Sequence, residues 1–369
     1  MNLFVPLLSI KYHGGTRVIC EMLDYFKKHN DNDNVNVLVL CPKNSIQTDF
    51  LTDSVDVKEI GIKKYRFIPK IMHQLLFMVC FIYFIRKEKG AVLANFFITW
   101  YPCFIAHKFF DFKLYYFIQG LEGLYKGAVG RNLNKLCTLT YKYKKQAIIP
   151  ANLFLKNEIR NYNSSSIVSF DYTVGLNNKF LNEFKYEERA VDICYFGRSE
   201  NWKRIDRFFD LLRIFDDKHI HITVSFISQD KLAINLARDF LSEIDSSFIE
   251  VVFHSPSCQD ELITKIRECK VFFGTSECEG FYLPPLESMS QFTLPILFDC
   301  GGPRLYINHK SNGYFVDEIE DAFNLIYMIK RNGLKDLNFL DMKKTAQYYS
   351  SDKSNRQFLD YIVLDLIND

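Results

Sequence analysis

Two carboxylates, Glu279 and Glu287, are separated by seven residues in a stretch rich in glycine and proline. The apolar run that ends at Gly274 predicts a buried parallel strand. Pro284 and Pro285 lie between the glutamates, and proline suits the first turn of a helix because its missing N–H is not needed there. We therefore predict Glu279 in the loop after a strand and Glu287 in the first turn of the next helix. Free N–H groups and the helix dipole favour an anion at that point.

A second apolar run, residues 295–298, leads into Gly301-Gly302-Pro303-Arg304, which is typical of another tight turn from strand to helix. Two such turns at neighbouring strand ends form a ligand crevice in open α/β sheets. Either glutamate alone would be explained as a partner of the helix dipole. The whole string, however, resembles the E-x7-E segment, and the turn after it, of the retaining glycosyltransferases of family 4 (glycosyl transferases group 1). It is similar to the pattern of bacterial surface-polysaccharide glycosyltransferases.

That resemblance implies an α/β protein with the GT-B fold, in which two Rossmann-like doubly wound domains face each other across a cleft. At 369 residues the chain is long enough for two domains of ordinary size. We expect an acceptor-side domain over residues 1–170 and a nucleotide-sugar-binding domain over residues 171–350. Residues 351–369 are expected to form a helix that crosses back to the first domain.

The composition narrows the class of protein. Hydrophobic residues make up 48% and charged residues 24% of the chain, so we expect folded globular domains. A net charge of +2 argues against nucleic-acid binding, which depends on neutralising many phosphates. The ten cysteines form no C-x-x-C pair and no Cys/His cluster with zinc spacing, which indicates reduced thiols in a cytoplasmic setting. The first residues carry no basic segment before the apolar run, so we expect a strand there and not a signal peptide.

A glycine pair follows the first apolar run, residues 3–10, and precedes a helical pattern that continues to about Lys28. Strand, glycine turn and helix form the first unit of a doubly wound domain. Because glycine has no Cβ, the backbone at Gly14 and Gly15 can approach a ligand phosphate closely. In the resembling family this loop approaches the donor diphosphate.

Further strands of the first domain are expected at residues 35–40, 91–98, 114–119 and 146–149. The third of these ends at Gln119, where members of the resembling family often carry a histidine close to the transferred sugar. Glutamine donates and accepts hydrogen bonds but takes no proton, so we exclude a general base at this position. Gln119 is then either a sugar or acceptor contact, or an amide that satisfies the loop backbone.

Asp31-Asn32-Asp33 matches the D-x-D metal site of the other major glycosyltransferase fold. It lies in a run of Asn and Asp between the first helix and the second strand, where these residues form turns through local hydrogen bonds. We interpret it as a solvated turn and expect no metal site.

In the second domain, strands are expected at residues 191–196, 222–227 and 249–254. The first ends in Gly197-Arg198, and Lys203 follows five residues after the arginine, so both cations can lie at the carboxyl edge of the sheet. This spacing resembles the G-R-x4-K element of the family, whose two cations hold the donor diphosphate.

The resemblance also implies a role for each candidate residue. Arg198 and Lys203 would stabilise the leaving diphosphate, with help from the glycine turns and the backbone N–H groups near the start of the helix. Glu287 would accept hydrogen bonds from the two ribose hydroxyls, and Glu279 would bind hydroxyls of the transferred sugar. Tyr282 stands where the family usually has a glycine, next to the sugar. The expected donor-binding residues of this segment are Gly280, Phe281, Tyr282 and Leu283.

Residues 71–85 are strongly apolar but too short to cross a bilayer. Lysine and arginine flank them on both sides. A helix buried between the sheet and its neighbours is the interpretation we favour. The alternative is a helix that rests on an anionic membrane surface, which would make the protein peripheral to the inner face of the cytoplasmic membrane.

We therefore expect a retaining, metal-independent hexosyltransferase that needs no cofactor beyond its nucleoside-diphosphate-sugar donor. The resemblance implies a glycan or lipid-linked glycan acceptor in the synthesis of bacterial O-antigen, capsule, lipopolysaccharide or a related polysaccharide. One alternative is a dinucleotide-dependent oxidoreductase, although no G-x-G-x-x-G follows an expected strand. Another is a non-catalytic partner subunit that has kept the fold.

Overall fold

The computed structural model describes most of the chain, and it divides into two compact units. Among the described residues the first unit extends to Val174 and resumes at Ser351, and the second runs from Gly175 to Ser350. The described residues are 1–10, 14–29, 35–46, 55–61, 69–121, 131–181, 189–244, 247–333 and 339–367.

The first unit contains a six-stranded parallel sheet in the order β3-β2-β1-β4-β5-β6. The chain starts in the middle of the sheet, moves to one edge and then returns to build the other half, so the topological switch point lies between β1 and β4. The central strands β1 and β4 are buried apart from Asn2, because helices cover both faces of the sheet. The strands are β1 (Asn2–Pro6), β2 (Asn36–Pro42), β3 (Asp56–Ile60), β4 (Gly90–Ala94), β5 (Lys113–Ile118) and β6 (Ala147–Pro150).

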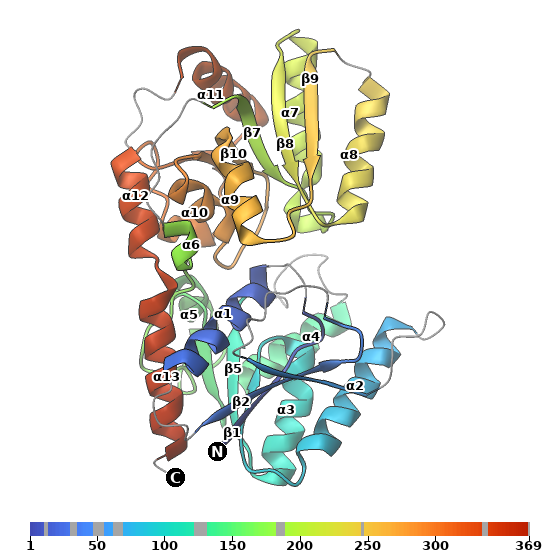
Figure 1. Ribbon diagram of the computed structural model, residues 1–369, viewed down its shortest axis with the longest axis vertical. Coiled ribbons are helices and arrows are strands. Elements are labelled where there is room, and N and C mark those ends of the chain that lie inside the picture. Colours follow the sequence, from blue (N-terminus) through green and yellow to red (C-terminus); the bar gives the residue numbers. More distant parts are fainter. Residues whose placement is uncertain are drawn as a thin grey trace. The chain divides into compact units, whose positions relative to one another are not determined.

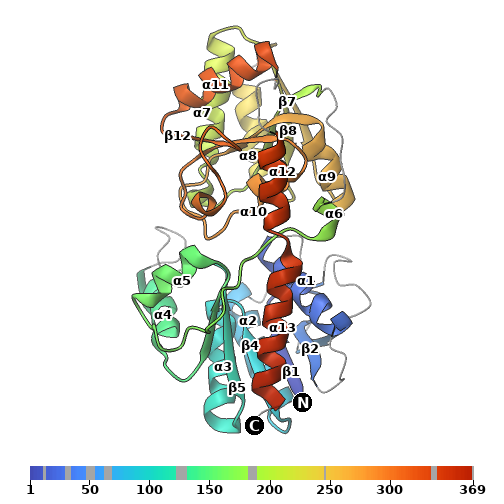
Figure 2. The ribbon, with the colours of Figure 1, turned by 90° about the vertical axis from the view of Figure 1, so that its left-hand side faces the viewer.

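The helices of this unit lie in two layers. On one side α1 packs against α13, and the two helices lie next to each other in Figures 1 and 2. On the other side α2 packs against α3, and α3 against α4. The C-terminal helix α13 is held to the end of the first unit by Tyr172, whose hydroxyl donates to Oδ1 of Asn355 over 2.8 Å. The helices are α1 (Gly14–His29), α2 (Lys70–Ile85), α3 (Phe97–Phe110), α4 (Arg131–Lys142), α5 (Leu153–Arg160) and α13 (Ser351–Ile367).

The second unit repeats the plan with a parallel sheet in the order β12-β11-β10-β7-β8-β9 (Figure 1). Its switch point lies between β7 and β10. The strands are β7 (Val191–Phe196), β8 (Ile222–Ile227), β9 (Ile249–His254), β10 (Cys269–Gly274), β11 (Leu294–Phe298) and β12 (Tyr314–Val316). The helices are α6 (Asn178–Leu181), α7 (Ile205–Asp217), α8 (Lys231–Ile244), α9 (Gln259–Arg267), α10 (Leu283–Ser290), α11 (Ile319–Asn332) and α12 (Phe339–Tyr348), with single 3-10 turns η1 (Asn201–Lys203) and η2 (Gly302–Leu305). The predicted fold of two Rossmann-like doubly wound sheets is confirmed.

Two features of the first sheet differ from the prediction. The strand expected at residues 91–98 ends at Ala94, and helix α3 begins at Phe97. The hydroxyl of Thr99 accepts from the backbone N–H of Phe96 over 3.2 Å and donates to its carbonyl over 2.9 Å, which fixes the helix start. The edge strand β3 was not predicted, because its sequence Asp-Val-Lys-Glu-Ile is short and largely polar.

A buried ion cluster joins three elements of the second unit. The carboxylate of Asp192 in β7, which is 3% exposed, lies 2.9 Å from Nζ of Lys270 in β10 and 2.6 Å from Nζ of Lys330 in α11. Burial alone would raise the pKa of Asp192, but hydrogen bonds from the two lysines outweigh it and lower the pKa below its ordinary value. The charged cluster therefore stabilises the packing of α11 on this sheet.

We predict that Asp192→Asn destabilises the second unit by about 3 kcal/mol at neutral pH, because both lysines lose their charged partner. A carboxyl with a lowered folded-state pKa stabilises the protein above its unfolded pKa of about 3.9, and this contribution is lost as pH falls through the folded value. Chemical unfolding as a function of pH should show the difference between wild type and variant shrinking in acid. Asp210→Asn is the control, since Asp210 pairs with Arg213 on the surface of α7 and is 51% exposed. Equal effects of the two substitutions at pH 7 would contradict the prediction.

Candidate functional site

Most candidate residues of the second unit lie in the loops at the carboxyl ends of β7 and β10, next to the loop after β11, while Leu283 and Glu287 lie in α10. β7 and β10 are neighbours in the sheet, with Phe273 opposite Tyr195, and β10 pairs in turn with β11. The loops that follow these strands therefore meet at the switch point, where open α/β sheets bind their ligands.

Backbone hydrogen bonds hold the loop of Glu279 against the glycine turn after β11. The N–H of Glu279 donates to the carbonyl of Cys300 over 2.8 Å, and the N–H of Gly302 donates to the carbonyl of Glu279 over 3.1 Å. A Cβ on residue 302 would lie 2.5 Å from the carbonyl oxygen of Gly280, so only glycine allows this approach. The position of the Glu279 backbone is thus fixed on both sides.

The loop after β7 is fastened to the same segment. The hydroxyl of Thr275 donates to the carbonyl of Lys203 over 2.7 Å, and the N–H of Glu277 donates to the carbonyl of Trp202 over 2.8 Å. Arg207, at the start of α7, donates to the carbonyl of Thr275 over 3.1 Å. These contacts bring the predicted cation Lys203 and the predicted carboxylate Glu279 to one place.

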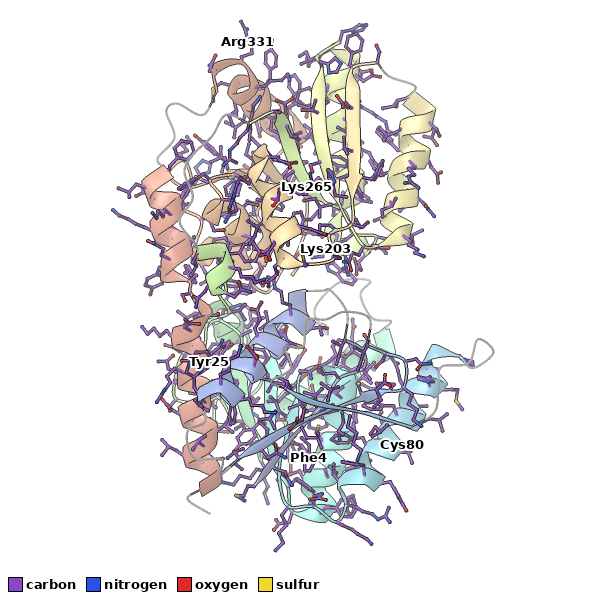
Figure 3. All side chains as sticks on the ribbon, viewed as in Figure 1. Phe4, Tyr25, Cys80, Lys203, Lys265 and Arg331 are labelled. Atoms are coloured by element: carbon purple, nitrogen blue, oxygen red, sulfur yellow. The ribbon has the colours of Figure 1, made fainter. Side chains whose placement is uncertain are left out.

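Lys203 and Glu279 form an ion pair with 2.5 Å between Nζ and Oε1. The side chain of Lys203 is 23% exposed and that of Glu279 is 13% exposed, so the pair is shielded but still reaches solvent. Nζ of Lys203 also lies 5.3 Å from the centre of the Tyr282 ring. Figure 3 labels Lys203, which ends the 3-10 turn between β7 and α7.

Arg198 has a carboxylate partner of its own, Glu200, which the sequence analysis missed. Nη2 of Arg198 lies 2.5 Å from Oε1 of Glu200. Burial works against both charges, but this pairing outweighs it, so the pKa of Arg198 is raised and that of Glu200 is lowered. No spacing rule predicts the pair. Arg198 and Glu200 are two positions apart in a loop, and side chains at that spacing face each other only in some backbone conformations.

Tyr282 occupies the residue before α10 with φ of +67°, in the left-handed region that non-glycine residues rarely adopt. Its ring packs against Phe272 with 6.0 Å between ring centres, and its carbonyl accepts from the hydroxyl of Tyr306 over 2.5 Å. Burial, and to a smaller extent the charge of Glu279, raise the pKa of the Tyr282 hydroxyl well above its usual range. Tyr282 is therefore a neutral, packed side chain beside the Lys203–Glu279 pair.

Glu287 lies in the second turn of α10, not in the first turn as predicted. The helix begins at Leu283, ahead of Pro284 and Pro285, so that Glu287 is its fifth residue. Proline is tolerated in the first turn, which allows the helix to start before the pair. The side chain is 2% exposed and lies among protein groups. Phe281 and Leu283 are also largely buried, at 5% and 8% exposure.

In the first unit the structure brings Gly15 and Gln119 together. Gly14 and Gly15 begin α1, and a Cβ on residue 15 would lie 2.9 Å from Oε1 of Gln119 at the end of β5. Glycine at position 15 therefore permits the close approach of these two segments. Lys11 to His13 and the Asp31-Asn32-Asp33 segment lie outside the described residues.

Within the described ranges, no group of three or more His, Cys, Asp or Glu side chains has the arrangement of a metal site. At the switch point, Arg198 and Lys203 are each paired with a carboxylate. Such a set can bind an anion and several hydroxyl groups.

Residues 178–331 match the family model described as glycosyl transferases group 1. No curated protein matches the chain in sequence.

Solved structures resemble the chain over its full length. HepE of Anabaena in complex with UDP-glucose has a TM-score of 0.71 at 14% identity, covering 99% of this chain and 100% of that chain. Sucrose-phosphate synthase of Thermosynechococcus elongatus has a TM-score of 0.77 at 12% identity and covers 100% of both chains. The lipopolysaccharide outer core galactosyltransferase WaaB in its apo form has a TM-score of 0.67 at 16% identity and covers 99% of both chains. Residues 178–331 thus carry the match to glycosyl transferases group 1, and the chain as a whole has the GT-B fold.

Proposed function

We propose that this protein is a retaining glycosyltransferase that moves a hexose-type sugar from a nucleoside-diphosphate sugar to a glycan or lipid-linked glycan. The observation that carries the proposal is the pairing of Lys203 with Glu279 at the switch point of a group 1 domain, beside Arg198. Two cations at a sheet edge suit a diphosphate, and an adjacent carboxylate suits the hydroxyls of a sugar. HepE, one of the similar structures, was solved with UDP-glucose.

In this proposal the donor replaces contacts that the free protein makes with itself. The diphosphate takes Lys203 from Glu279 and Arg198 from Glu200, and the released Glu279 carboxylate accepts hydrogen bonds from the sugar. As the bond between the anomeric carbon and the diphosphate breaks, its electron pair leaves with the phosphate, and both cations stabilise the growing negative charge. The acceptor oxygen bonds to the same carbon from the same face, and its proton passes to the leaving phosphate.

The remaining candidates position the donor. Glu287 accepts from the two ribose hydroxyls, and the backbone N–H groups of Phe281 to Leu283 face the phosphates at the start of α10. Gly14, Gly15 and Gln119 of the first unit contribute contacts to the diphosphate and to the sugar or acceptor. Neither a metal nor a further cofactor takes part in the proposed reaction.

We further propose that the reaction takes place on the cytoplasmic side and serves a bacterial surface polysaccharide such as lipopolysaccharide, O-antigen or capsule. WaaB, one of the similar structures, is a lipopolysaccharide outer core galactosyltransferase. The cysteines support the cytoplasmic side: all those in the described residues, for example Cys103 and Cys194, are free thiols.

The direct test is protection by nucleotides in a thermal unfolding experiment. We predict that UDP or GDP raises the unfolding temperature by several degrees at a concentration about a hundredfold above its Kd, because ligand binding stabilises only the folded protein. Glu287→Ala should reduce this shift. Stabilisation by NAD and by no nucleoside diphosphate would replace the proposal by an oxidoreductase. Nucleotide binding without hydrolysis or transfer of any sugar donor would indicate a non-catalytic partner subunit.

Because Lys203 and Glu279 form an ion pair, we predict that substitutions at the two residues have opposite effects on the affinity for a nucleoside diphosphate. Lys203→Ala should weaken binding of the protective nucleoside diphosphate roughly tenfold and should lower turnover about a hundredfold. Glu279→Gln should tighten binding of the same sugar-free diphosphate about fivefold, because it releases Lys203 from a partly shielded carboxylate. Titration calorimetry measures both changes in binding affinity, and the rate of sugar transfer measures turnover. Glu277→Gln is the matched control, since Glu277 lies in the same loop and its side chain is 56% exposed. Weaker binding by Glu279→Gln would contradict a competing ion pair.

We predict that Tyr282 influences which donor sugar the protein accepts. Tyr282→Gly removes a ring beside Lys203 and relieves a left-handed backbone that costs on the order of 1 kcal/mol. We expect the rate of donor hydrolysis to shift toward bulkier sugars, measured as the ratio for an N-acetylhexosamine donor over the matching hexose donor. Tyr282→Phe retains the ring and should leave the ratio unchanged. An equal ratio in wild type and Tyr282→Gly would exclude Tyr282 from sugar selection.

A further inference from the structure

Helix α2 is apolar on both of its faces. Phe77, Phe81 and Ile85 are buried against the first unit with at most 2% exposure. The opposite stripe carries Ile71, Leu75, Val79 and Tyr83, which follow the four-residue spacing of one helix face and are 50–67% exposed. The prediction of a helix covered by the sheet and its neighbours is therefore correct for one face and wrong for the other.

An outward face of this kind is unusual for a helix on the surface of a soluble unit, whose outer stripe is normally polar. Lys70 is the one charged residue in the sequence of α2. The next charge along the helix axis is Arg86, whose guanidinium lies 3.4 Å from the centre of the Tyr83 ring. A cation thus covers one end of the apolar stripe, as expected where an apolar surface meets a charged interface.

The neighbouring helices extend the same layer (Figure 1). On α3, Ile105 is 37% and Phe109 is 72% exposed, and on α4 Leu139 is 57% exposed. The hydroxyl of Tyr101 in α3 donates to the carbonyl of Leu136 in α4 over 3.1 Å, which joins the two helices at their outer edge. Figure 3 labels Cys80, which belongs to α2. This helix lies at the edge of the first unit, and its outer side chains project away from the unit.

This layer is also strongly basic. The segments that contain α2, α3 and α4, residues 69–121 and 131–146, also include strands β4 and β5; they hold eleven lysines and arginines and two acids, Glu88 and Asp111, a net charge of 11 − 2 = +9. The whole chain has a net charge of only +2, so all other residues together carry −7. Lys87, Lys89 and Lys108 are exposed at the ends of α2 and α3. Lys113 belongs to strand β5 and not to these helices, and it pairs with Asp365 of α13.

We propose that the outer face of α2, with the basic residues of the α2–α3–α4 layer around it, binds the surface of a membrane that contains anionic lipids. The apolar stripe enters the boundary between headgroups and acyl chains, and the lysines and arginines contact the lipid phosphates. The helix lies in the plane of the membrane, since no helix in the described part of the chain is long and apolar enough to cross it.

Charge also decides between a membrane and a second copy of the chain. A two-fold contact through this face would place its exposed cations, among them Lys87, Lys89 and Lys108, close to those of the second copy, and like charges repel across an interface. An anionic lipid surface instead neutralises the layer. Membrane contact by α2 is independent of the chemistry at the donor site, so its test needs no substrate.

The experiment is flotation of the full chain with vesicles of phosphatidylethanolamine and phosphatidylglycerol, compared with vesicles of phosphatidylcholine alone. We expect flotation with the anionic vesicles at low salt, less at high salt, and little with phosphatidylcholine. The double substitution Leu75→Glu and Val79→Glu should lower the bound fraction at least about tenfold, because it places two anions in the inserting stripe. Replacing Arg86, Lys87 and Lys89 together by glutamine should lower the apparent affinity roughly a hundredfold.

Matched controls separate insertion from a general loss of apolar surface. Leu232→Glu on α8 and Leu364→Glu on α13 replace leucines that are 58% and 61% exposed on other helices, and both variants should float like wild type. All variants should keep the unfolding temperature of wild type, since every replaced side chain lies on the surface. Absence of flotation, equal flotation with phosphatidylcholine, or equal loss in the control variants would overturn the proposal. So would a change from dimer to monomer in the α2 variant without vesicles, which would identify a second copy as the occupant.

Discussion

The pairing of β7 with β10 is the contact on which the rest of the second unit depends. Ile193 lies opposite Val271 and Tyr195 opposite Phe273, although two strands and three helices separate β7 and β10 along the chain. Because the chain fills both halves of the sheet from these two strands, their loops emerge at the same edge. Lys203 and Glu279 can then meet, because the loops that carry them lie side by side at this edge and are hydrogen-bonded to each other.

How much of this fold the sequence predicts depends on how each segment is buried. β7, β8 and β9 have the predicted bounds, because a short apolar run between polar turns has few other solutions. The apolar run after Ala94 is compatible with two structures, a strand or a buried helix. The hydroxyl of Thr99 favours the start of a helix there. Edge strand β3 is half exposed and largely polar, so its sequence lacks the run of apolar residues that predicts a buried strand.

For the candidate site, the sequence identifies the groups but not their partners. The sequence indicates separate ligand-binding roles for Arg198, Lys203, Glu279 and Glu287, and the structure adds that two of them bind each other. Seventy-six positions separate Lys203 from Glu279, and only the folded sheet closes that distance. The same limit applies to α2, where periodicity predicts a helix but cannot show which of two apolar faces the sheet covers.

The carboxylates beside the two cations also determine how the free protein behaves among other anions. Arg198 and Lys203 are each balanced by a glutamate, so the local field at this edge is far weaker than that of two exposed cations. A small ion such as inorganic phosphate would have to displace a carboxylate already held at 2.5 Å and would bring no further contacts of its own. A ligand that joins a diphosphate to a nucleoside and a sugar gains from all three parts at once. Under the proposed function, the two ion pairs therefore favour binding of a nucleoside-diphosphate sugar over binding of inorganic phosphate.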